Sequence, residues 1–285
     1  MRALFLVSFA VALLTLAIAL SYSAARKQSA SAVHSGPYLG LDLNEYPGDE
    51  ALLVFRKTFS FISFWLGPPP GEKSNSWQGK RALLKSHGFG FVVLFNARES
   101  RKLRNSADAR QKGTLDAQAA AQLAQQEGFA KGTLIFLDIE EGGRLPASYH
   151  AYLQVWSDTL TKAGFRPGVY CSAIPVDEGH GVHITTVQDI QAHIAAPALV
   201  YWVFNLACPP ALGCAFPPQP PSPTQSGFPP ATVWQYAQSP RTEFSSGCPA
   251  NFAPDGNCYA PGDTKHHWIL DANVATTPDP SSSNE

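Results

Sequence analysis

The sequence predicts an α/β fold, a (β/α)8 TIM-like barrel with reduced helix content after strands six and seven. Short apolar segments alternate with helical segments over residues 39–205, which is typical of a parallel sheet. The expected domain has about 240 residues, near the roughly 250 of such barrels. Nine prolines then interrupt the helical pattern between Cys208 and Pro230. An open doubly wound sheet is the alternative.

Each element is expected from an apolar run or a helical period. The first six strands are expected at residues 39–42, 59–65, 91–96, 133–140, 168–172 and 198–205. The helices between them are expected at residues 49–57, 77–87, 116–127, 148–163 and 186–194. Three of these helices are followed by a glycine at the position where helices commonly end: Gly88, Gly128 and Gly164. The last two strands are expected at residues 232–237 and 268–274, joined by loops rather than helices.

The two ends of the chain differ in composition from the barrel. Residues 1–25 contain Arg2, a long apolar run and the small residues Ser23-Ala24-Ala25, which predicts a secretory signal peptide. A membrane anchor is the alternative, because the run approaches the roughly 20 residues that span a bilayer. Residues 26–37 read as a linker, 38–275 as the barrel and 276–285 as a disordered tail. The protein is therefore expected to be secreted or periplasmic, with membrane contact only through an uncleaved N-terminal segment.

The charge balance argues against a nucleic-acid partner. The chain has 21 Lys and Arg against 22 Asp and Glu, a net charge of −1. Neutralising phosphates requires an excess of basic residues that this sequence lacks.

The cysteines suggest loop disulfides rather than a metal site. Pairing of nearest neighbours would link Cys208 to Cys214 and Cys248 to Cys258, each within one loop. Cys171 lies in an apolar run and is expected to be a buried free thiol. Zinc is disfavoured because the chain has no Cys-x2-Cys pair. No metal or organic cofactor is expected.

Polar residues interrupt the apolar strands near the ends where barrel enzymes place their chemistry. Each is expected toward the C-terminal part of its strand: Asp42, Asp138, Glu140, Asn205, Gln235 and Asp271. Asp138 and Glu140 are two residues apart and should share one face, with Ile139 on the other. Two carboxyls in an enclosed site tend to differ in pKa, as a general acid and its anionic partner require. Glu141 should lie on the opposite face and is given no role.

Aromatic and amide side chains near these strand ends suit a sugar ligand. The aromatic candidates are Tyr170, Trp202, Trp234 and Tyr236. Asn205 and Gln235 are candidates for hydrogen bonds to the hydroxyl or amide groups of a ligand.

Taken together, these motifs resemble those of a known family. In order they are Gly40-Leu41-Asp42, Asp138-x-Glu140, Gly168-Val169-Tyr170, Tyr201-Trp202, Val233-Trp234-Gln235-Tyr236 and Leu270-Asp271-Ala272-Asn273. They resemble the strand-end motifs of the family-25 lysozymes, secreted muramidases that cleave the glycan of peptidoglycan with a helix-poor (β/α) barrel. The segments 116–121, 128–140 and 166–170 more closely resemble the glycoside-hydrolase-like domains of exported bacterial proteins, a sister group of unknown function. The resemblance spans residues 38–275.

The resemblance implies roles for four carboxyls. Glu140 would be the general acid, with Asp138 beside it tuning charge, and Asp42 and Asp271 would orient the substrate and the acid pair. The sequence departs from the muramidases after Asp42, where residues 43–48 replace a Ser and a turn, and after Trp202, where Val203-Phe204-Asn205 and a proline-rich insertion follow.

Two functions compete at this point. The first is an exported glycosidase acting on peptidoglycan or another polysaccharide; the second is a catalytically inactive barrel that binds carbohydrate at the cell wall. Retention of both Asp138 and Glu140 favours the enzyme. A phosphodiesterase barrel is disfavoured, because none of the eight histidines falls at a strand end as that chemistry requires.

Overall fold

A computed structural model describes residues 36–196, 198–205, 220–238 and 270–282. These residues belong to one compact unit that begins at Gly36. The predicted signal peptide or anchor, residues 26–35 of the linker and the four loop cysteines lie outside the described residues. Within the described part, no helix has the length and apolar character needed to cross a membrane.

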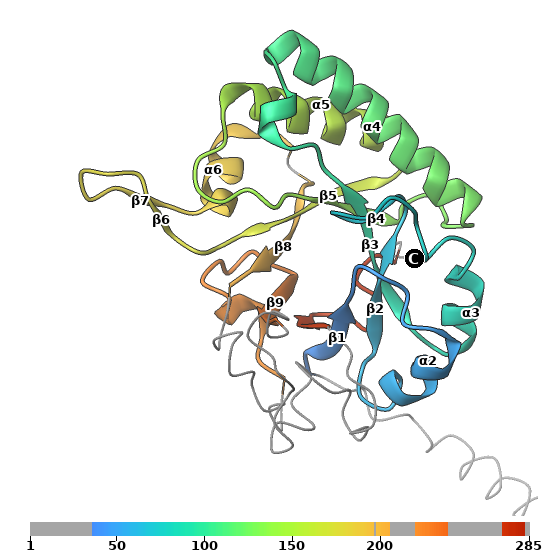
Figure 1. Ribbon diagram of the computed structural model, residues 1–285. Coiled ribbons are helices and arrows are strands. Elements are labelled where there is room, and N and C mark those ends of the chain that lie inside the picture. The colour runs from blue at the N-terminus through green and yellow to red at the C-terminus, as the bar shows by residue number, and fades with distance from the viewer. Residues whose placement is uncertain (1–35, 197, 206–219, 239–269, 283–285) are drawn as a thin grey trace, which may run out of the picture. The chain divides into compact units, whose positions relative to one another are not determined.

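Eight strands form a closed barrel, which confirms the predicted fold class (Figure 1). The barrel strands are β1 (Tyr38–Asp42), β2 (Phe61–Trp65), β3 (Gly90–Asn96), β4 (Leu134–Asp138), β5 (Arg166–Ser172), β8 (Val200–Phe204), β9 (Val233–Ala237) and β10 (Asp271–Ala275). Their order around the barrel is β1, β10, β9, β8, β5, β4, β3 and β2. The seven barrel strands β1, β2, β3, β4, β5, β8 and β9 pair in parallel with one another.

The last strand runs the other way. β10 is antiparallel to both β9 and β1, so the barrel is mixed and not fully parallel as the sequence predicted. An antiparallel neighbour starts at the end of the barrel where the previous strand stops, so the chain needs no crossover helix to reach it. The direction of β10 therefore removes the need for a crossover helix between β9 and β10.

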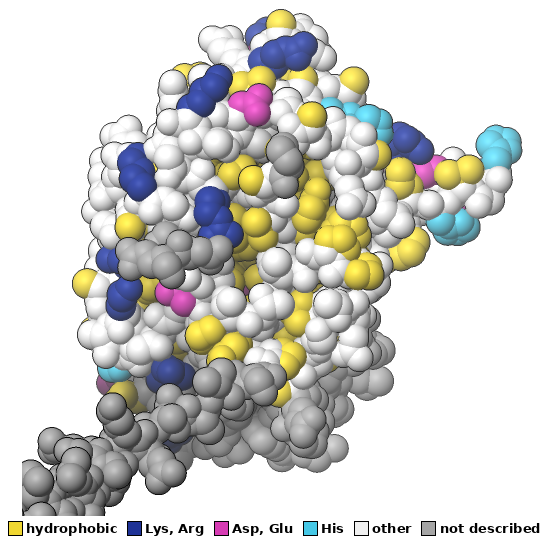
Figure 2. Space-filling view, turned by 180° about the vertical axis from the view of Figure 1, so that it is seen from behind, with side chains coloured by type: hydrophobic (Ala, Val, Ile, Leu, Met, Phe, Trp, Pro, Cys, Tyr) yellow, Lys and Arg dark blue, Asp and Glu magenta, His cyan; other side chains and the backbone are white. Residues whose placement is uncertain are grey.

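Helices cover the outside of the barrel between its first strands. They are α2 (Asp49–Phe55), α3 (Arg81–Ser86), α4 (Ser106–Gln126), α5 (Ala147–Lys162) and α6 (Thr186–His193), with short 3-10 turns η1 (Ser100–Lys102) and η2 (Pro223–Gln225). In the described residues, no α-helix lies between β8 and β9, in line with the expected loss of helices after strand six. A small hairpin, β6 (Val176–Asp177) with β7 (His183–Ile184), projects from the body and was not predicted (Figures 1 and 2).

α4 begins at Ser106, well before the predicted start at Asp116. Asn105 caps the helix, because its side chain accepts hydrogen bonds from the backbone N–H groups of Ala107 and Asp108. Gly113, within α4, allows this helix to cross α5 closely. A Cβ at position 113 would lie 2.5 Å from the carbonyl oxygen of Tyr152.

The core lies inside the barrel and between the barrel and its helices. Every residue of β2, β4 and β9 is buried, as expected for strands covered on both faces. Phe136 packs edge-on against Trp202 inside the sheet, with ring centroids 5.6 Å apart. Cys171 is a buried free thiol, as predicted, and burial raises its pKa.

The described part of the tail is ordered, which corrects the prediction of disorder for residues 276–282. Asp279 accepts a hydrogen bond from the Phe91 N–H, and the Ser281 hydroxyl accepts one from the Val93 N–H. The Ser281 carbonyl also accepts the Leu134 N–H. The tail thus supplies acceptors to backbone donors at the starts of β3 and β4. Gly90 makes room for the tail, because a Cβ at position 90 would lie 2.1 Å from the Pro278 carbonyl oxygen.

Candidate active site

A cavity of about 540 Å³ opens at the carboxyl ends of β2, β3 and β4. Its walls are residues 68–72, 96–99, 138, 140 and 141, from the ends of these strands and the loops after them, joined by Lys102 and Tyr149. Loops at this end of a barrel are where enzymes of the fold build their sites. Asp138 and Glu140 both line the cavity, so the two carboxyls predicted as a pair face the same space.

Asp138 is the last residue of β4 and is only 3% exposed. Its Oδ2 atom is buried and has no hydrogen-bond partner among the described residues. Burial, together with the nearby carboxylates of Glu140 and Asp42, raises the pKa of Asp138 well above its usual value. The neutral, protonated form of this carboxyl is therefore favoured.

Glu140 lies on the loop beyond β4, because the strand ends two residues earlier than predicted. The residue is exposed, although partial desolvation at the mouth of the cavity raises the pKa of its carboxyl. An accessible carboxyl with a raised pKa can donate a proton to a bound molecule. Between the two acids, Ile139 is buried, as the alternation predicted.

Asp42, at the end of β1, lies at the centre of a hydrogen-bond network. Its Oδ1 atom accepts hydrogen bonds from the side-chain amides of Asn273 and, at 3.0 Å, Gln235. Burial raises the pKa of Asp42 to about 6, while these two donors act in the opposite direction by stabilising the carboxylate. The Glu140 charge raises it further, so Asp42 and Glu140 interact electrostatically.

Asp271 joins this network from the neighbouring strand. It is the first residue of β10 and lies directly opposite Asp42 in the register. The prediction that Asp271 sits toward the C-terminal part of its strand is wrong, but the reversed direction of β10 brings it to the same end of the barrel. Gln235 Nε2 lies 3.4 Å from Asp271 Oδ2 and so bridges the two carboxyls.

Two predicted sugar-binding residues, Tyr170 and Trp202, donate hydrogen bonds to the amide side chains that contact Asp42. The Tyr170 hydroxyl donates to Gln235 Oε1 at 2.8 Å, and Trp202 Nε1 donates to Asn273 Oδ1 at 2.9 Å. Trp202 and Gln235 are each 1% exposed. The structure therefore places Gln235 and Trp202 inside the barrel, where they position Asp42 and have no free face for a sugar ring.

Asn205 and Tyr236 lie apart from the carboxyl network. The Asn205 side chain donates to the Ser226 carbonyl oxygen at 2.7 Å and so holds the β8–β9 connection. Tyr236 alternates with Gln235 along β9 and packs edge-on against Trp234, on the other face of the strand. This arrangement does not direct either residue toward the four carboxyls.

Sequence reasoning missed Asn273 and Glu141. Asn273 is fully buried and contacts Asp42 and Trp202, and its spacing of two residues from Asp271 on one strand was the available signal. Glu141, given no role, lines the cavity and accepts a hydrogen bond from the Ser100 N–H. Arg98, on the loop after β3, also lines the cavity and forms a two-pronged ion pair with Asp116 of α4.

Solved structures with the same fold include two with good overlap. An uncharacterised protein of B. stearothermophilus matches with a TM-score of 0.53 and 21% identity, over 84% of this chain and 95% of that one. The spore cortex lytic enzyme SleM of Clostridium perfringens matches with a TM-score of 0.52 and 14% identity, over 85% of this chain and 68% of that one. No curated protein matches the sequence.

A family model described as "Rv2525c-like, glycoside hydrolase-like domain" matches residues 71–205. This segment includes β3, β4, β5 and β8, and with them the Asp138–Glu140 pair and the cavity loop after β3. Residues 71–205 therefore match an Rv2525c-like, glycoside hydrolase-like domain, and the resemblance drawn from segments 116–121, 128–140 and 166–170 is confirmed.

Proposed function

We propose that the protein is an exported glycosidase that hydrolyses a cell-wall glycan with Glu140 as its general acid. The observation that carries the proposal is the placement of Asp138 and Glu140 in one cavity at the carboxyl end of β4, with Asp42 interacting with both. Hydrolysis of a glycosidic bond requires a protonated carboxyl near the leaving oxygen and an ionised carboxylate near the sugar ring.

The environments of the three carboxyls suit different tasks. Glu140 is the accessible acid, and its raised pKa keeps more of it protonated as the pH approaches neutrality. Asp42, held by two amide donors and with a pKa of about 6, is mostly ionised at pH 7 and would stabilise positive charge on the sugar. Asp138 lies beside Glu140 and would tune its proton affinity through its own protonation state.

The cell wall is the first substrate to test because a protein of the same fold, SleM, is a spore cortex lytic enzyme. The full chain would be incubated with purified peptidoglycan, and reducing ends and muropeptide fragments would be measured. We expect release by the parent and a loss of at least about 100-fold in Glu140→Gln, since proton transfer contributes on that order. Glu50→Gln, on α2 and away from the cavity lining, is the matched control and should keep full activity.

One observation favours the second candidate, a barrel that binds carbohydrate without cleaving it. The pKa values of Asp42, Asp138 and Glu140 are all raised, so the site favours neutral carboxyls and offers less negative charge to a developing sugar cation. If the parent co-sediments with the wall yet releases nothing across a range of pH values and glycans, the binding barrel replaces the glycosidase.

A further inference from the structure

Asp189 on α6 is a buried carboxylate outside the proposed active site. The residue is 0% exposed, and it does not line the cavity of Glu140. Its Oδ2 atom accepts the Leu145 N–H at 3.0 Å, whereas Oδ1 is buried without a hydrogen-bond partner among the described residues. A buried carboxylate is costly unless a positive charge compensates it.

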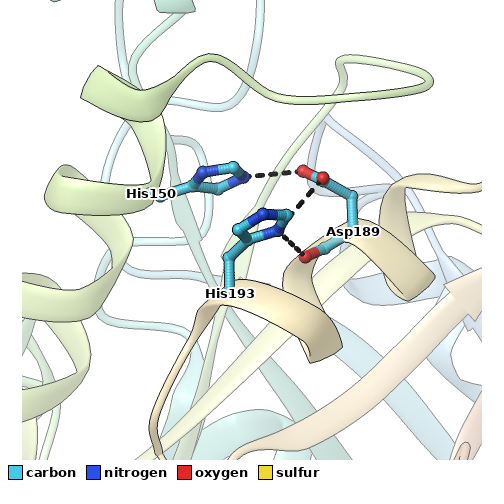
Figure 3. Close-up of side chains that lie close together, drawn as sticks. All are labelled: His150, Asp189 and His193. Atoms are coloured by element: carbon cyan, nitrogen blue, oxygen red, sulfur yellow. Dashed lines mark hydrogen bonds and ion pairs between the residues drawn. The ribbon is translucent and has the colours of Figure 1, made fainter.

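Two histidines supply the only ion-pair partners of Asp189 within the described ranges. His150 on α5 places Nε2 2.7 Å from Asp189 Oδ2, and His193, one helical turn after Asp189, places Nδ1 3.2 Å from Oδ1. The His193 Nδ1 also lies 2.8 Å from the Asp189 backbone carbonyl oxygen, which can only accept a hydrogen bond, so Nε2 is the His193 nitrogen available to an ion. Figure 3 shows the three side chains converging from the two helices. One ligand atom from each residue can be chosen so that all lie within 4.8 Å of one another.

The two imidazole rings are stacked, with centroids 4.2 Å apart and an angle of 8° between their planes. Neutral imidazoles are metal ligands, and a divalent cation held between the two rings and Asp189 would also compensate the buried carboxylate.

We propose that His150, Asp189 and His193 form a binding site for a divalent transition-metal ion of the zinc type. Two imidazole nitrogens and one carboxylate oxygen are a donor set that Zn²⁺ accepts readily. Asp189 and His193 are four residues apart on one helix face, and His150 completes the set from the adjacent helix. The His193 side chain is 43% exposed and that of His150 16%, so an ion can enter from solvent and keep a fourth position for water.

Hydrogen bonds around the proposed metal site connect it to the loop that carries Glu140 and Glu141. The Leu145 N–H fixes the orientation of Asp189, as outer-shell partners of metal ligands commonly do. Thr186, also on α6, donates its hydroxyl to the Glu141 carbonyl oxygen at 3.1 Å. A bound ion would therefore link α5, α6 and both ends of the loop that carries Glu140 and Glu141. The expected effect is on stability, independent of whether the barrel cleaves glycan.

Zinc binding to the metal-free full chain would be measured by calorimetry and by thermal unfolding with and without Zn²⁺. The parent should bind one equivalent more than His150→Gln/His193→Gln, and zinc should raise the Tm of the parent but not of the double variant. His193→Gln alone, at a half-exposed position that should fold normally, should weaken this equivalent at least about tenfold. His183→Gln, an exposed histidine on β7, is the matched control and should bind as the parent does.

Comparison of stoichiometries is needed because histidines and cysteines outside the described residues can also bind zinc. Circular dichroism would establish that each variant is folded. The proposal is overturned if the parent and His193→Gln bind zinc with the same stoichiometry and affinity, or if zinc stabilises both equally.

Discussion

Asp42 shows how one residue can combine a charge with burial. Its carboxylate accepts two side-chain amides, from Gln235 and Asn273, and those amides are held in turn by Tyr170 and Trp202. Each bond fixes the orientation of the next, so the carboxylate is positioned before any ligand arrives. Even so, desolvation exceeds the effect of these donors, and the pKa of Asp42 remains raised to about 6.

This raised pKa predicts how stability depends on pH. Because the folded pKa of about 6 exceeds the ordinary 3.8, the folded state binds more protons between these values, and the free energy of unfolding falls as the pH rises through them. The loss from Asp42 alone is about 3 kcal/mol. Asp42→Asn should therefore show a shallower decline between pH 4 and pH 6 in urea unfolding curves.

Asp138 and Glu140 also have raised pKa values, so the free energy of unfolding of Asp42→Asn still falls in part as the pH rises. The test is therefore the difference between the parent and Asp42→Asn in the slope of unfolding free energy against pH. Parallel curves for the parent and Asp42→Asn would contradict a raised pKa at this position.

At the same scale, the four carboxyls were accessible to sequence reasoning because each interrupts an apolar strand. The alternation of side chains also placed Asp138 and Glu140 in one space. The burial of Trp202 and Gln235 was not accessible, because an aromatic or amide near a strand end reads the same whether it faces a ligand or a neighbouring strand. Only the cross-strand bonds distinguish the two.

The crossing of α4 and α5 depends on the missing side chain of Gly113. A single glycine in a helix ordinarily costs stability relative to alanine, yet here the Tyr152 carbonyl occupies the place of a Cβ. The helix was predicted from its Ala/Gln-rich segment alone, whereas the structure extends it back to the N-cap at Asn105.

Gly113→Ala should destabilise the protein by about 1–3 kcal/mol, since the helices must separate or shift to admit the methyl group. Gln118→Ala, on an exposed position of the same helix, gains propensity without a clash and is the control. Urea unfolding of both variants measures the difference. An unchanged or increased stability of Gly113→Ala would show that the crossing can relax at no cost.

The tail is a second element whose effect can be tested. Ending the chain after Pro278 removes the acceptors of the Phe91, Val93 and Leu134 N–H groups. At about 1 kcal/mol for each bond, the cost should be about 3 kcal/mol. Hydrogen exchange at these three amides should be faster in the shortened chain than in the parent. A chain ending after Ser282 keeps all three bonds and serves as the control.

If the shorter chain unfolds at the same urea concentration as the control, the tail contributes nothing to stability. This packing was not predictable from composition, because two prolines and three serines are typical of a disordered segment. The order comes from unpaired backbone donors at the starts of β3 and β4, which composition does not report.

Over the whole molecule, the alternation of strands and helices was sufficient to predict a closed barrel. The direction of β10 was not predictable in the same way, because the length and composition of a loop do not fix the end of the barrel at which the next strand begins. On the face drawn in Figure 2, the Lys and Arg side chains lie mainly along the left side and the top of the view.

Closure through β10 makes folding depend on both ends of the barrel sequence. β1 comes from residues 38–42, and its neighbour β10 from residues 271–275. While the chain is still being synthesised, β1 and β9 lack this neighbour and keep open edges that can pair with other chains. The edge of β9 exists only once residues 233–237 have been made, and completion of the barrel waits for residues 271–275.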